Sequence, residues 1–177
     1  MNYSNQMIPE VLHGFNVYDG GGNMQIGILD EMSMAEIKNK VATVSGAGIT
    51  ESYEVPVLGY FDSIVQEIPF RVLYLNLSEL VNPMKLQTIN IRGSIQVTDK
   101  STMVSDLVSF RYMVKGRSIG FNPGTLKLGE TMGAKISIEA TYVLIEIGGK
   151  IMVEIDKLNS IFKIDGVDLL EKARRMC

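Results

Sequence analysis

The chain has 177 residues, enough for one domain that buries roughly 70% of the surface exposed by its unfolded form. Hydrophobic residues make up 46% of it, which excludes disorder as the expected state. A formal net charge of −3 excludes the basic footprint that nucleic-acid binders carry.

The absence of targeting and membrane-spanning patterns and the low cysteine count favour the reducing interior of a cell. The sequence contains no run of about 18 apolar residues, and no charged start followed by an apolar run and a cleavage site. We therefore expect no membrane anchor and a soluble protein made in the cytoplasm. The single cysteine, Cys177, excludes an intrachain disulfide, and its terminal position predicts an exposed, incidental thiol.

The N-terminal part predicts strands joined by tight turns. Residues 1–9 are polar and carry little pattern, so we expect a loose arm. The pattern then predicts a strand at Val11–Val17, a glycine-rich turn at Asp19–Asn23 and a returning strand at Met24–Leu29. Residues 30–40 have helical spacing, which is a weak indication of a helix.

Gly46-Ala47-Gly48 resembles the start of a dinucleotide-binding loop. The third glycine of that fingerprint is missing, because Glu51 occupies its position, and no helical pattern follows. A β-turn or loop is therefore expected. Two strand-like segments come next, each with a proline that belongs at a sheet edge or a bulge: Thr50–Pro56, and Val57–Leu73 with Pro69.

The centre of the chain predicts a short helix and two long strands. Asn76 caps the helix, whose apolar side carries Leu77, Leu80, Val81 and Met84. Gln87–Thr98 is the cleanest strand, and Val104–Lys115 is the next; residues 116–134 predict a long loop. The polar face of the first strand consists of Thr88, Asn90, Arg92, Ser94, Gln96 and Thr98.

Residues 135–175 predict a hairpin followed by a helix. Gly148-Gly149 supplies the positive-φ positions of a tight turn between two strands. One face of the first strand is expected to carry Ile136, Ile138, Ala140, Tyr142 and Leu144, and one face of the second Ile151, Val153 and Ile155.

The helix is expected after the turn at Asp165-Gly166. Asp168 is a candidate N-cap, with Glu171 at its capping-box position. Its apolar stripe would consist of Leu169, Leu170, Ala173 and Met176, and its last turns carry Lys172, Arg174 and Arg175.

Residue types suited to catalysis or metal binding are scarce. His13 is the only histidine and lies in a strand-like context, so we interpret it as structural or surface-exposed. One histidine and one cysteine cannot form a common zinc site. We expect no catalytic residue, no cofactor and no metal. Four carboxylates on polar strand faces are interpreted as solvated: Glu139, Glu146, Glu154 and Asp156.

The C-terminal segment carries a family resemblance. The residues that carry the resemblance are Val153-Glu-Ile-Asp156, Asn159, Ile161, Lys163, Gly166-Val167-Asp168, Leu170-Glu171 and Arg174-Arg175. Together they resemble the signature of the major tail tube protein of contractile-tailed phages and of R-type bacteriocins. Ser45–Gly48, Met113–Arg117 and Lys135–Ser137 match further family segments, so the resemblance covers roughly residues 8 to 175.

The resemblance implies a fold and a function. The fold is a mainly β, sandwich- or barrel-like antiparallel sheet with one short flanking helix and a C-terminal helix, in a single domain over residues 1–177. Residues 30–40 are extended in this family, so we expect a strand there. Six copies would form a ring, and the rings would stack into a tube inside a contractile sheath, in contact with baseplate and tail terminator proteins. Such a tube conducts DNA in a phage, or ions through the pierced envelope in a bacteriocin.

A different class of protein remains open from residues alone, namely a small cytoplasmic β-barrel enzyme or ligand-binding module. The resemblance favours the structural subunit. Exposed strands would then be assembly surfaces, because neighbouring subunits would pair with the free backbone N–H and C=O groups at their edges.

Two sets of assembly residues follow from the structural interpretation. The first is the flexible loop of Ser45, Gly46, Ala47, Gly48, Ile49, Thr50 and Glu51, expected at a ring–ring or subunit–subunit contact. The second is Arg174 and Arg175, which either neutralise the helix end or bridge to a neighbour's carboxylate. The polar face of Gln87–Thr98 would suit a wet lumen, and an ordinary solvent-facing sheet explains its alternation equally well.

Overall fold

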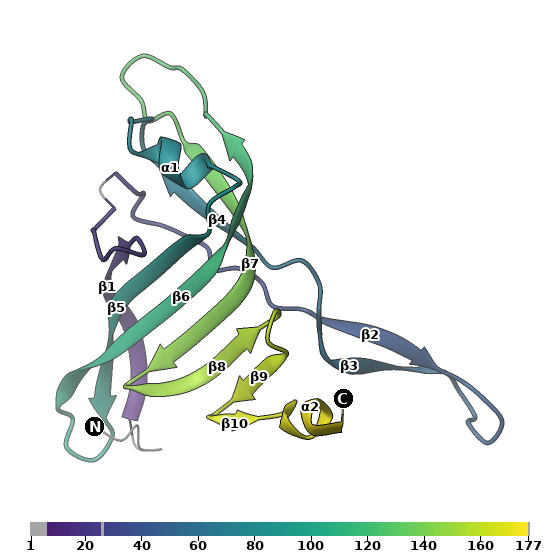
Figure 1. The fold of residues 1–177 in the computed structure, drawn as a ribbon. Helices are drawn as coiled ribbons and strands as arrows, with labels where there is room; N and C mark the ends of the chain where they lie inside the picture. The colour runs from purple at the N-terminus through teal and green to yellow at the C-terminus, as the bar shows by residue number, and fades with distance from the viewer. Residues whose placement is uncertain (1–6, 26, 177) are drawn as a thin grey trace.

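The computed structural model describes residues 7–25 and 27–176, so Cys177 and most of the expected N-terminal arm lie outside the described residues. The strands form a curved antiparallel sheet of eight strands and a two-stranded sheet that projects from it (Figure 1). Two short helices complete the described part of the chain. The expected mainly β fold is confirmed.

The large sheet follows a simple order with one branch. Strands β1, β5, β6, β7, β8, β9 and β10 lie side by side, and β4 pairs with the first half of β7. The bounds are β1 Met7–Tyr18, β4 Val65–Phe70, β5 Gln87–Asp99, β6 Ser105–Asn122, β7 Ala134–Ile147, β8 Lys150–Asp156, β9 Ile161–Ile164 and β10 Val167–Asp168. The projecting sheet pairs β2 (Asn39–Val44) with β3 (Tyr53–Phe61), and the helices are α1 (Leu77–Val81) and α2 (Glu171–Met176).

One face of the large sheet forms the core, as the alternation predicts. Its fully buried side chains include Ile68, Ile89, Val114, Ile136 and Ile138. Leucines of α1, together with Phe162 and Leu170 from the C-terminal end, join the same cluster. Apolar side chains of residues 28–37 pack against it from outside the strands, so this segment forms a strap on the core.

A bulge in β7 corrects one predicted face. Ala140 pairs with Gly116 and Tyr142 pairs with Lys115, so Thr141 is an extra residue in the strand. Beyond it the faces exchange, and Val143 rather than Tyr142 enters the core. A Cβ at Gly116 would lie 1.9 Å from the carbonyl oxygen of Glu139, so only glycine fits beside the bulge.

The N-terminal predictions need three corrections. β1 begins at Met7, inside the expected loose arm. Among the described residues of the expected strand Met24–Leu29, which leave out position 26, the pairing is limited to the isolated bridges Tyr18–Met24 and Ile28–Phe70, and none of these residues belongs to a strand. Of residues 30–40, only the last two belong to a strand, and residues 30–38 are irregular. Side-chain packing on the core decides these conformations, and local propensity does not encode it.

The predicted loop at 116–134 is also too long. β6 continues to Asn122 because residues 116–122 pair with the first half of β7, which leaves 123–133 as the loop. Pairing with a neighbouring strand overrides the glycine-rich local composition. The prolines are placed as predicted: Pro56 lies in the two-stranded sheet beside a register shift, and Pro69 lies in β4, which pairs only with β7.

Candidate assembly surfaces

The predicted contact loop lies at the tip of the β2–β3 hairpin, far from the large sheet (Figure 1). The amide of Ile49 donates to the carbonyl of Gly46 at 3.1 Å, and Gly48 has φ +91°. The segment is therefore a turn and does not have the geometry of a nucleotide-binding loop. All seven predicted residues, Ser45 to Glu51, are exposed.

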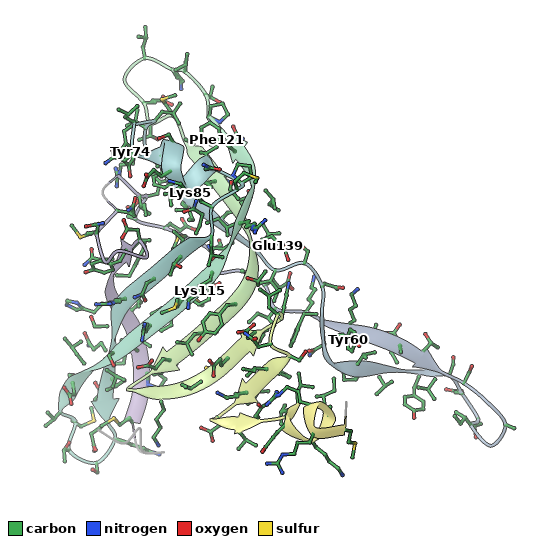
Figure 2. The ribbon with its side chains drawn as sticks, in the orientation of Figure 1. Tyr60, Tyr74, Lys85, Lys115, Phe121 and Glu139 are labelled. Carbon is green, nitrogen blue, oxygen red and sulfur yellow. The ribbon has the colours of Figure 1, made fainter. Side chains whose placement is uncertain are left out.

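The hairpin also exposes large apolar side chains along its length. Val41, Tyr53, Leu58 and Tyr60 are each more than half exposed, and Figure 2 labels Tyr60 near the body of the protein. A two-stranded ribbon has little stability of its own in water. An exposed apolar ribbon of this kind is typical of a surface that another chain covers.

A second uncovered surface lies at β1. This strand pairs with β5, and among the described residues its other edge makes the isolated bridge Tyr18–Met24 at its C-terminal end, so most of that edge has no strand partner. Beside it lies an apolar groove of about 390 Å³, whose lining includes Val11, Leu12, Met34 and Phe110. This surface could not be predicted from the sequence, because its apolar residues follow the same pattern as core residues.

The six predicted lumen residues share one face of β5. Arg92 is exposed, whereas Asn90 and Thr98 are only 7% exposed and are therefore not free surface in the subunit. Thr98 and Ser105 form a hydrogen bond of 3.0 Å, and Gln96 donates to Glu10 at 2.8 Å. The face is thus a network of polar contacts between strands.

The network continues on β6 to β9, which the sequence analysis missed. Polar residues alternate there too, and the polar sheet face, as we name it, adds Arg111, Lys115, Tyr142, Glu146, Glu154 and Lys163 to the β5 residues; Lys115 is labelled in Figure 2. The amide of Asn90 lies between two guanidinium groups. Its oxygen accepts from Arg111 at 3.3 Å in one orientation of the amide, or from Arg92 at 3.3 Å in the other.

Aromatic rings hold two of the cations on this face. The guanidinium carbon of Arg92 lies 5.1 Å from the centre of the Tyr18 ring, and the ammonium of Lys115 lies 4.9 Å from that of Tyr142. Burial, with the hydrogen bond to Glu154, raises the pKa of Tyr142 to about 12. This tyrosine therefore stays neutral at physiological pH.

The four carboxylates interpreted as solvated are instead partners of other residues. Glu146 pairs with Arg111 at 3.6 Å, and Glu154 pairs with Lys163 at 2.8 Å. Asp156 accepts from the amides of residues 158 and 159, both at 3.0 Å. Their partners come from other strands or loops, which explains why the strand pattern alone does not reveal them.

The fourth carboxylate, Glu139, lies where the hairpin leaves the body (Figure 2). It pairs with Lys157 at 3.0 Å and accepts from Ser63 and from the amide of Ile64. Burial alone would raise the pKa of Glu139, but the hydrogen bonds from Ser63 and Lys157 outweigh it and lower the pKa.

The C-terminal helix is shorter than predicted and does not bury a stripe. It begins at Glu171, and none of its own residues is buried; only Leu170, just before it, enters the core. The amide of Leu170 donates to Asp168 at 3.0 Å. Asp168 therefore caps the turn before the helix instead of the helix itself.

The two arginines differ in their contacts. Arg174 pairs with Asp168 and donates to the carbonyl of Ser160 at 2.6 Å. Arg175 pairs with Glu171 one turn away, and its side chain is 77% exposed. Arg174 thus joins two parts of its own subunit, and Arg175 lies on the surface.

Within residues 7–25 and 27–176, no cluster of three metal-ligating side chains occurs, and none of the helices is long and apolar enough to span a membrane. His13 is exposed on β1, at the register shift between Leu12 and Gly14.

The family model of phage tail tube protein FII matches residues 9–176 of this chain. The chain belongs to the phage tail tube protein FII family. The resemblance seen in the sequence is thereby confirmed, and this tail tube protein is a structural component of a contractile tail and not an enzyme.

The chain is similar to one curated protein in sequence and to one solved structure in fold. The tail tube protein of Escherichia phage P2 is 30% identical over 175 residues, which cover 95% of this chain and 96% of that protein. A chain in the cryo-EM structure of the six-fold symmetrised baseplate of the anti-feeding prophage has a similar fold. It is 11% identical, with a TM-score of 0.51 over 78% of this chain and 96% of that chain. This tail tube protein is therefore a component of a virion tail.

Proposed function

We propose that the chain assembles into rings of six copies, and that the rings stack into the hollow inner tube of a contractile tail. The observation that carries this proposal is the β2–β3 hairpin. It extends beyond the rest of the subunit and exposes apolar side chains, including Val41 and Tyr53, that its own chain leaves uncovered. Ordering such a ribbon in one place costs conformational entropy, which contacts with another copy would offset.

The Ser45–Glu51 loop would then meet the next ring or a neighbouring subunit. Its glycines let the tip adapt to the surface that it contacts. The free edge of β1 and the apolar groove beside it would be covered by another copy within the ring. A protrusion and a groove on different sides of one subunit make a head-to-tail contact, which yields closed rings when the rotation closes.

The polar sheet face would line the lumen. A conduit for DNA must not hold its cargo, since each phosphate neutralised by a free cation adds affinity. Arg111 is paired with Glu146 and Lys163 with Glu154, which supports a lining of low phosphate affinity. In a phage the tube would pass DNA, and in a bacteriocin it would pass ions.

The remaining partners follow from the same proposal. A contractile sheath would surround the tube, and baseplate and tail terminator proteins would contact its two ends. Assembly would take place in the bacterial cytoplasm. The edge-pairing of β strands between copies would remove the exposed edges that otherwise favour aggregation.

The test is to replace Gly46-Ala47-Gly48 with a bulky polar triplet. Ala47→Ser, which keeps both glycines, is the matched control. We expect the triplet variant to remain a folded monomer that forms no tubes in electron micrographs, while the control assembles. Tubes of unchanged length from the triplet variant would contradict the proposed contact.

A further inference from the structure

The hairpin contains an elbow where it leaves the body. Asn39 pairs with Phe61 and Val41 pairs with Pro56, so only Lys40 lies opposite the four residues 57–60. Such a large bulge bends a two-stranded ribbon and interrupts its hydrogen bonds. Gly59, inside the bulge, has φ +79°, a conformation that side-chain-bearing residues rarely adopt.

Leu170 closes this elbow from the C-terminal end of the chain. A Cβ built on Gly59 would lie 2.7 Å from both terminal methyl groups of Leu170, so the leucine fills the space that the glycine leaves. Next to it, the rings of Phe61 and Phe162 meet edge to face, with centroids 5.0 Å apart. The elbow therefore packs on the C-terminal segment and not on the large sheet alone.

Arg174 fixes the segment that carries Leu170. Its guanidinium group bridges Asp168, two residues before the leucine, and the carbonyl of Ser160 before β9. The amide of residue 169 donates to the carbonyl of Phe162 at 2.8 Å and fixes the same turn from the other side. Arg175 takes no part in this arrangement, because its partner is Glu171 on the helix surface.

The strap that enters β2 has an anchor of its own. The amide of Ala35 donates to the side-chain oxygen of Gln66 at 3.0 Å, and Gln66 donates to the carbonyl of Ser33 at 2.9 Å. Both strands of the hairpin are thus held at their base, one by the strap and one by Leu170. A backbone bond from the amide of Asp62 to the carbonyl of Lys38, at 3.0 Å, joins the two strands at this base.

We propose that Leu170, seated by the Arg174–Asp168 ion pair, sets the direction in which the β2–β3 hairpin leaves the body. Both Leu170 and Arg174 are then positioning residues for assembly, an inference that rests on the proposed function. The contact of Leu170 with Gly59 inside one subunit would then determine where the Ser45–Glu51 loop lies, and so where this loop meets another subunit.

The experiment measures the hairpin's direction in unassembled full-length protein. Cys177→Ser removes the only cysteine, and Ala47→Cys with Lys100→Cys places spin labels at the hairpin tip and on an exposed turn of the large sheet. Pulsed electron resonance then gives the distribution of distances between the labels. We expect Leu170→Ala and Arg174→Gln to broaden and shift this distribution.

The matched controls are Leu169→Ala and Arg175→Gln, which should leave the distribution unchanged. Circular dichroism checks that each variant is folded, and Arg174→Gln carries the test if Leu170→Ala does not fold. The same variants without labels should lose tube formation, and the two controls should keep it. A narrow, unshifted distribution in a folded Leu170→Ala or Arg174→Gln variant would overturn the inference.

Failure of the proposed function and failure of the positioning role give different results. If the unsubstituted protein forms no tubes while Leu170→Ala still broadens the distances, the proposed function is wrong and the positioning role stands. Intact tubes from the polar triplet at 46–48 would refute only the loop contact. If the triplet blocks assembly and the distances stay narrow in both positioning variants, only the positioning role is wrong.

Discussion

The buried hydrogen bond between Gln66 and Tyr112 offers a quantitative test of how the strap is held. Tyr112 is 1% exposed, and its hydroxyl donates to the side-chain oxygen of Gln66 at 2.9 Å. The amide of Ala35 also reaches this hydroxyl, at 3.3 Å. Gln66 is fully buried and holds the strap by two further bonds, one at Ala35 and one at Ser33.

Substituting Tyr112 or Gln66 should therefore lower the unfolding free energy by different amounts. Tyr112→Phe removes one hydroxyl, and the amide of Ala35 keeps its bond to Gln66, so the loss in unfolding free energy should be about 1 kcal/mol. Gln66→Met leaves the buried Tyr112 hydroxyl without the acceptor of its proton and the Ser33 carbonyl without its donor. At about 1–3 kcal/mol for each group left unsatisfied, the loss should be at least twice as large.

Urea unfolding of the unassembled subunit measures both losses, and the double variant completes the cycle. The double variant should cost more than Gln66→Met alone, because the amide of Ala35 then loses both of its acceptors. If Gln66→Met cost no more than Tyr112→Phe, or if the double variant cost no more than Gln66→Met, the account of the strap's anchor would be refuted.

Three further outcomes are expected. Gly116→Ala should lower the melting temperature, with a loss of about 1–3 kcal/mol, because its Cβ would collide with the carbonyl of Glu139; an unchanged melting temperature would rule out the tight bulge. Tyr112 and Tyr142 both have a pKa of about 12, raised from 10 by burial, so their contribution to stability is fully present below pH 10 and is lost as the pH rises toward 12. Circular dichroism against pH should show this alkaline loss, and a flat profile up to pH 12 would count against it. Amide hydrogen exchange of unassembled subunits should be fast in the β2–β3 hairpin and slow in β7 and β8, and uniform protection would disagree with the free hairpin.

The parts of the fold that the sequence predicted are those fixed by local chemistry. Gly148 and Gly149 have φ of +59° and +77° and make the expected turn between β7 and β8. The alternation in Gln87–Thr98 gives β5 nearly residue for residue, with one residue added at its end. A turn or a clean alternation needs only neighbouring residues, so a single sequence suffices.

The missed features depend on contacts between distant segments. The bulge at Thr141 exchanges the faces of β7, and nothing in its neighbours in sequence marks it. The strap at residues 28–37 takes its shape from Gln66, about 30 positions away. The isolated helix pattern at the C-terminus likewise gave no sign that Leu170 packs on Gly59 in the hairpin.

The candidate assembly surfaces also contain parts that the sequence predicted and parts that it did not. The Ser45–Glu51 loop was predicted from its glycines and lies at an exposed tip. The polar face of β5 was predicted from its alternation, but its extension through Arg111, Lys115 and Glu154 depends on strand order. Arg174 and Arg175 are adjacent in sequence, and only the fold separates a residue that holds the C-terminal turn from one on the surface.

Cryo-electron microscopy of the purified, self-assembled protein tests the central claim most directly. The account predicts stacked six-fold rings around an open channel, with the Ser45–Glu51 loop of each subunit against another copy and the polar sheet face toward the channel. A stable monomer, or a polymer in which the hairpin tip contacts no other copy, would contradict it.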